Sequence, residues 1–131
     1  MKEIVIITQN RAGLVADISD ALAAKGINIE TLDAEDAHDM AVVALTVDRY
    51  DEALGALRDA GFDAVTEDAL VIRLPDEPGA LAKVARRFKD ADIDLRSLRI
   101  IQRQQGFALV ALAAERTEQA RALVKDYLIR E

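Results

Sequence analysis

Two short polar loops carry the residues of this chain that could bind a small molecule. The first loop spans residues 9–13 and contains Asn10, and the second spans residues 75–79 and contains Asp76. Apolar residues at helical spacing follow each loop, so each loop is expected to lead into a helix. Unpaired backbone N–H groups at a helix N-terminus can hold a carboxylate. The loops are therefore candidate sites for a ligand that carries a carboxylate.

Two asparagines could form hydrogen bonds to such a ligand. Asn10 and Asn28 each offer hydrogen-bond donors and acceptors, enough between them to recognise an ammonium and a carboxylate. Catalytic candidates are scarce, because the chain has no cysteine and a single histidine, His38, which is expected at a solvated hairpin tip. Thiolate sites, histidine metal clusters and cysteine nucleophiles are thereby excluded. We expect a protein that binds no metal and no cofactor.

The composition of the chain limits the classes of molecule that it could bind. The formal net charge is -7, and the 17 basic residues are scattered among 24 acidic ones, which disfavours binding to a phosphate backbone. Aromatic residues make up only 4% of the chain, too few for a base-stacking surface. No apolar run approaches the roughly 20 residues of a membrane span, and the N-terminus does not resemble a secretory signal. The sequence thus predicts a cytoplasmic protein that binds neither nucleic acid nor membrane.

The elements that position the two loops form a repeat. Gly13 and Gly79 are 79 − 13 = 66 residues apart, and a strand-like run precedes each loop, at residues 4–8 and 70–74. Second β-rich segments, at residues 26–32 and 92–98, keep this spacing. The apolar stripes expected on the helices after the two loops are Leu14, Val15, Ile18 and Leu22 in the first copy and Leu81, Val84 and Phe88 in the second.

Beyond these segments the spacing changes to 67, because residues 40–45 align with residues 107–112. We expect the one-residue difference in the hairpin loop, where length changes are tolerated. A second helix follows in each copy, at residues 50–60 and about 117–127, and residues 62–66 form a last strand in the first copy only. The end of the chain is too short for an equivalent strand.

This order predicts an α+β fold of two ferredoxin-like βαββαβ units in tandem, each with an antiparallel sheet and helices on one face. The domains are expected at residues 1–67 and 68–131. The last strand of the second unit is expected to be missing or truncated, or to be supplied by a partner.

The motif D-E-P-G-A-L at residues 76–81, followed by Val84, Phe88 and I-D-L at residues 93–95, resembles the ACT domain family. The first copy resembles it too, with N-R-A-G-L-V at residues 10–15 and I-N-I at residues 27–29, although Ala12 stands where the family favours proline. The resemblance implies an amino-acid site at the loop between first strand and first helix, formed against a neighbouring unit. The implied ligand-binding residues are Asn10, Arg11, Ala12, Gly13, Leu14, Asn28, Ile29, Asp76, Pro78, Gly79, Ala80 and Asp94.

The resemblance also implies that Asn10 and Asn28 bind an effector from opposite units. The second copy has Asp76 and Asp94 at these places, which would repel a ligand carboxylate and attract its ammonium. The two sites should therefore differ in ligand, or the second site is retained only for packing.

The function implied is that of an amino-acid-binding regulator, not an enzyme. It would take a free amino acid as effector, form a homodimer or larger homo-oligomer, and act on a regulated enzyme or regulator protein. One alternative is an assembly module without a small ligand, in which Asn10 and Asp76 cap helices, the loop glycines relieve crowding and Asn28 faces outward on a plain strand. Another is an acylphosphatase-like hydrolase that uses Arg11, but no glycine-rich phosphate cradle supports it.

Overall fold

The computed structural model describes residues 2–37 and 40–129, so His38 lies outside the described residues. The chain divides into two compact units, Met1–Glu67 (unit 1) and Asp68–Glu131 (unit 2). Within the described residues, no helix combines the length and the hydrophobicity needed to cross a membrane.

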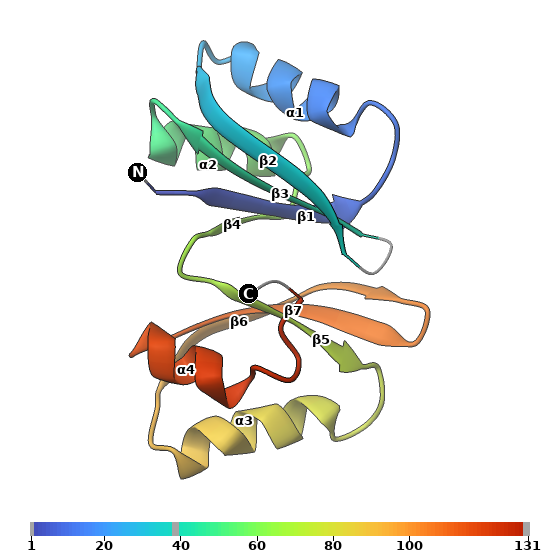
Figure 1. Ribbon diagram of the computed structural model, residues 1–131, viewed down its shortest axis with the longest axis vertical. Helices are drawn as coiled ribbons and strands as arrows, with labels where there is room; N and C mark the ends of the chain where they lie inside the picture. The colour runs from blue at the N-terminus through green and yellow to red at the C-terminus, as the bar shows by residue number, and fades with distance from the viewer. Residues whose placement is uncertain (1, 38–39, 130–131) are drawn as a thin grey trace. The chain divides into compact units, whose positions relative to one another are not determined.

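Unit 1 is a βαββαβ fold with a four-stranded antiparallel sheet (Figure 1). The strands lie in the order β2-β3-β1-β4, and β1 pairs with both β3 and β4. Its elements are β1 (Ile4–Gln9), α1 (Leu14–Ala23), β2 (Ile29–Ala37), β3 (Met40–Val47), α2 (Tyr50–Asp59) and β4 (Ala64–Thr66). The ferredoxin-like prediction is confirmed for this unit.

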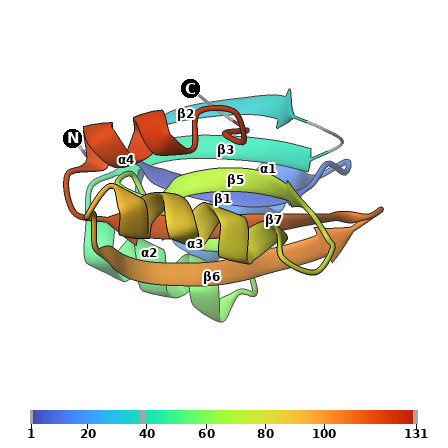
Figure 2. The ribbon, with the colours of Figure 1, turned by 90° about the horizontal axis from the view of Figure 1, so that it is seen from below.

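Unit 2 repeats the fold with a three-stranded sheet in the order β5-β7-β6. Figure 2 shows α3 and α4 over one face of this sheet. Its elements are β5 (Leu70–Pro75), α3 (Ala80–Asp90), β6 (Leu95–Gln104), β7 (Phe107–Ala114) and α4 (Thr117–Leu123).

The last strand of unit 2 is truncated, as the sequence predicts. In its place Leu128 forms a single antiparallel bridge with Ile72 on β5. The Ile129 N–H donates to the Val71 carbonyl at 3.2 Å, next to this bridge. The helix before it is shorter than expected, since α4 ends at Leu123 instead of near residue 127. The residues after α4 therefore turn back to cover part of the β5 edge.

Apolar side chains on one stripe of each first helix form the two cores. Leu14, Ile18 and Leu22 of α1 are buried against the unit 1 sheet, and Val84 and Phe88 of α3 are buried in unit 2. These positions match the expected stripes. Val15 does not match, because it is 43% exposed.

One residue of β6 accounts for the change in repeat spacing. Ile100 pairs with Val110 and Gln102 pairs with Leu109, so Ile101 is an extra residue in a β-bulge. The hairpins themselves close on equivalent pairs, Ala37 with Met40 and Gln104 with Phe107. The expected insertion in the hairpin loop is wrong: it lies inside the strand, where a bulge keeps the following side chains on their original face.

An arginine at the start of the second helix holds the end of the first helix in both units. Arg49 donates through Nη2 to the carbonyls of Lys25 and Gly26, just beyond α1. Arg116, at the same place before α4, donates to the Asp92 carbonyl beyond α3. These bonds satisfy carbonyl groups of the turn that follows the first helix in each unit.

Candidate ligand-binding site

The first helix of unit 1 begins at a glycine in the left-handed conformation. Gly13 is the N-cap of α1 with φ 82° and ψ 3°, and no side chain caps the helix. A Cβ atom added at Gly13 would meet no heavy atom within 4 Å, so the crowding interpretation of this glycine is wrong. Glycine is favoured here because of its positive φ, which costs other L-residues energy.

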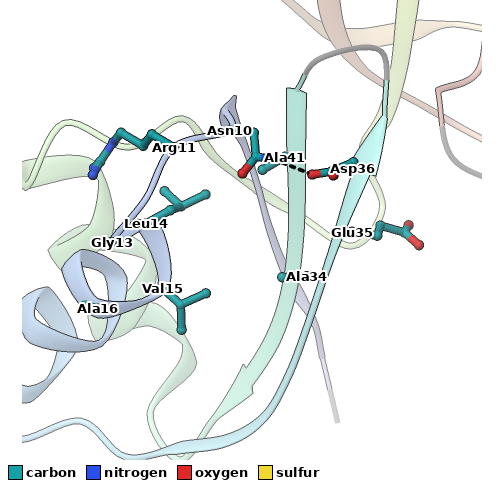
Figure 3. Close-up of a pocket in the computed structure, with 10 residues that line it drawn as sticks. All are labelled: Asn10, Arg11, Gly13, Leu14, Val15, Ala16, Ala34, Glu35, Asp36 and Ala41. Carbon is teal, nitrogen blue, oxygen red and sulfur yellow. Dashed lines mark hydrogen bonds between the residues drawn. The ribbon is translucent and has the colours of Figure 1, made fainter.

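A cavity of about 310 Å³ lies beside this helix start. Figure 3 shows it between the first turn of α1 and the far end of β2, with Leu14 and Val15 on the helix side and Ala34 on the strand side. The exposed Val15, which the stripe pattern assigns to the core, belongs to this cavity. The lining residues are Asn10, Arg11, Gly13, Leu14, Val15, Ala16, Ala34, Glu35, Asp36 and Ala41.

Asn10 and Asp36 meet at the rim of the cavity. The Asn10 Nδ2 atom donates a hydrogen bond to Asp36 Oδ1 at 2.8 Å (Figure 3). The alternative in which Asn10 caps the helix is wrong, because its side chain turns to β2 instead. Asp36 was not among the residues expected from the sequence, although pairing of the hairpin strands would have brought it opposite Ala41 and close to the loop.

The other residues of the first loop do not take part in the contact between Asn10 and Asp36. Arg11 forms an ion pair with Asp17 at 2.6 Å, with both side chains about half exposed. Its guanidinium group points away from Asp36 in Figure 3. Ala12 is exposed in the loop, and Leu14, the first residue of α1, is buried while it lines the cavity.

Asn28 and Ile29 lie at the opposite end of β2 from Asp36. Asn28 precedes the strand, so the interpretation as part of a plain strand is wrong, and Ile29 is the first residue of β2. The Asn28 N–H donates to Asp48 Oδ1 at 3.1 Å, and the Asp48 N–H donates to the Asn28 carbonyl at 3.2 Å. Within unit 1, therefore, Asn10 and Asn28 do not come together.

Unit 2 has a smaller cavity at the equivalent place. It measures about 80 Å³, and Ala80, the first residue of α3, contributes to its lining. At its rim Arg103 Nε lies 3.2 Å from Asp76 Oδ1. Asp76 therefore forms an ion pair and does not cap the helix. Asp94 lies outside this cavity, and its N–H donates to Glu115 Oε1 at 3.1 Å.

The second loop places Pro78 directly before the cap of the helix. The N-cap of α3 is Gly79, with φ 87° and ψ -13°, and the helix begins at Ala80. Pro78 is therefore a loop residue and not part of the first helical turn. No side chain caps α3, as in unit 1. Among the described residues, no group of three or more His, Cys, Asp or Glu side chains is placed to hold a metal ion.

Comparison with known proteins identifies the family of this architecture. Residues 1–128 match the family model described as an ACT domain pair. No curated protein matches the chain.

Several solved structures are similar over almost the whole length. Protein BT0572 from Bacteroides thetaiotaomicron is 24% identical, with 97% of this chain and 90% of that chain covered and a TM-score of 0.49. The regulatory subunit of aspartate kinase from Thermus thermophilus is 21% identical, with 96% and 91% covered and a TM-score of 0.45. The acetolactate synthase small subunit from Thermotoga maritima is 10% identical, with 98% and 89% covered and a TM-score of 0.42.

Proposed function

The chain belongs to the ACT domain pair family, and from this premise we propose that it is an amino-acid-binding regulatory protein and not an enzyme. The proposed site is the unit 1 cavity at the start of α1. Unit 2 has a cavity about a quarter of that size, so we assign ligand binding to unit 1.

The observation that carries the proposal is an open helix start beside a partly apolar cavity. No described side chain caps the N-terminus of α1. The Leu14 N–H donates to the Arg11 carbonyl, so the Val15 and Ala16 N–H groups are the ones that we assign to a ligand carboxylate. Leu14, Val15 and Ala34 supply an apolar wall for a ligand side chain. A cavity of about 310 Å³ is at the lower end of the range usual for small-molecule sites.

Regulation requires that the amino acid changes a coupled equilibrium. We propose that binding changes either the homo-oligomeric state of the chain or its affinity for a regulated protein in the cytoplasm. In this scheme Asn28, at the other end of β2, acts in a neighbouring copy, as the family resemblance implies.

Calorimetric titration of the full chain with each of the 20 common L-amino acids tests the proposal. We expect at least one of them to bind saturably, and Asn10→Ala to weaken that binding. Asp76→Ala is the matched control, because it changes the equivalent position in unit 2 and should leave the affinity unchanged. A chain that binds none of these amino acids would refute the proposed function.

One observation favours an assembly module as the second candidate. The Asn10 side chain is already hydrogen-bonded to Asp36, so it has a structural partner in the absence of any ligand. Under this alternative Asn10→Ala changes only stability, by about 1 kcal/mol for one lost hydrogen bond. Urea denaturation and titration of the same variant separate the two functions.

A further inference from the structure

Asp36 is placed to face a ligand in the unit 1 cavity. It pairs with Ala41 of β3, and Ala41 belongs to the core beneath the helices. Asp36 therefore lies on the helix-covered face of the sheet, near the end of β2. Glu35 has the opposite orientation, since it pairs with Val42, which is outside this core cluster, and its carboxylate points away from Leu14 in Figure 3.

The charges around the cavity leave Asp36 as the group suited to a cation. Among the described residues of the lining, Arg11 is the one arginine, and it is paired with Asp17. Asp36 accepts a hydrogen bond from the neutral amide of Asn10 at one oxygen, Oδ1. A carboxylate has about four lone-pair sites on its two oxygens, so it can accept further donors while this bond is kept.

The helix start and Asp36 lie on different sides of the same cavity. The N–H groups of α1 suit a carboxylate and Asp36 suits an ammonium, with apolar side chains between them. We propose that Asp36 binds the α-ammonium group of the amino acid and makes unit 1 selective for ligands that carry it. This inference rests on the proposed function, because it assigns a specificity residue within that site.

Unit 2 provides an internal comparison. The bulge at Ile101 brings Arg103 to the position of Asp36, because Arg103 pairs with Ala108 as Asp36 pairs with Ala41. There the rim pair is a guanidinium and a carboxylate, in place of a carboxylate and a neutral amide. An arginine at this position repels an ammonium, and its ion pair with Asp76 stands at the rim of the smaller cavity.

The test compares amino acids with the 2-hydroxy acids that replace the ammonium by a hydroxyl. Suitable pairs are L-valine with 2-hydroxyisovalerate and L-phenylalanine with 3-phenyllactate, together with the corresponding pair for any other amino acid bound in the full panel. Asp36→Asn is the principal variant, because an amide oxygen can still accept the hydrogen bond from Asn10. Asp33→Asn is the matched control, since it makes the same exchange three residues away on the other face of β2, where Asp33 pairs with Ala44 and does not line the cavity.

We expect Asp36→Asn to weaken binding of the amino acid by at least about tenfold, the lower end for a hydrogen bond to a charged group. Asp33→Asn should change it by less than about threefold. The preference of the wild-type chain for the amino acid over its 2-hydroxy acid should shrink in Asp36→Asn and persist in Asp33→Asn.

Two failures are distinguishable. A wild-type chain that binds no amino acid refutes the proposed function itself. If the wild-type chain binds an amino acid, the function stands. The role of Asp36 is overturned if Asp36→Asn binds that amino acid with the wild-type affinity, or if Asp36→Asn and Asp33→Asn lose equally. Equal loss for the amino acid and its 2-hydroxy acid in Asp36→Asn also overturns it, because that pattern reflects a structural effect.

Discussion

Gly13→Ala should destabilise unit 1 through the backbone alone. Gly13 has φ 82°, and a Cβ atom built there meets nothing within 4 Å. The added methyl group therefore creates no clash, and the cost comes from the left-handed conformation, roughly 1–2 kcal/mol for an L-residue. The smaller conformational entropy of the unfolded chain offsets roughly 0.4–1 kcal/mol of this. We expect a net loss of about 1 kcal/mol.

Gly55 supplies a control in the same unit. It lies within α2, is exposed, has no positive φ, and its added Cβ also meets nothing within 4 Å. Alanine is more favourable than glycine inside a helix by about 0.8–1.0 kcal/mol. Gly55→Ala should therefore stabilise unit 1, and the two variants should differ by about 2 kcal/mol although each adds one methyl group.

Urea denaturation followed by far-ultraviolet circular dichroism measures both effects. The slope of the unfolding free energy against urea concentration should stay unchanged in both variants. A Gly13→Ala variant as stable as the wild type would refute the requirement for a positive φ at the helix start. A loss above about 4 kcal/mol would instead point to a steric contact, because the backbone term cannot supply so much.

Three further outcomes follow from contacts in the two units. The hydrogen bond from Arg87 lowers the pKa of Asp126, so the stability that this carboxylate adds is present above its unfolded pKa and lost as the pH falls through its lower folded pKa. Asp126→Asn should flatten that acid-side loss in urea denaturations between about pH 7 and pH 2. Ile129→Pro removes the N–H that bonds to the Val71 carbonyl, so it should destabilise unit 2 by about 1 kcal/mol. It also exposes more of the β5 edge, so light scattering should detect more self-association. Arg49→Ala removes the donor to the carbonyls after α1 and should lower the thermal midpoint, with a loss of about 1 kcal/mol because the side chain is partly exposed.

The fold could be predicted because apolar spacing decides it. Leu14, Ile18 and Leu22 recur on one face of a helix, and burial of that face against a sheet is what the fold requires. Apolar runs likewise mark the strands, and the same succession of strands and helices along the chain occurs in both copies.

The candidate site could be predicted only in part. The loop glycines mark the helix starts, but side-chain partners at the rim depend on pairing between strands distant in sequence. Asp36 reaches Asn10 only through the register of β2 with β3, which sequence spacing alone does not fix. Arg103 was missed for a further reason, because a bulge shifts its alignment by one residue. Val15 fits the helical period and still lines a cavity, because the period alone does not show which part of a helix face the sheet leaves uncovered.

The bulge in β6 has an evolutionary consequence. An inserted residue in a regular strand would turn the side chains beyond it to the opposite face, so Arg103 would leave the face on which it meets Asp76. Ile101 absorbs the insertion locally, so the distal arm of the hairpin can lengthen or diverge while its base stays fixed. After duplication, one half of such a gene is free to change the charge at the cavity rim without rebuilding the interior that it inherited.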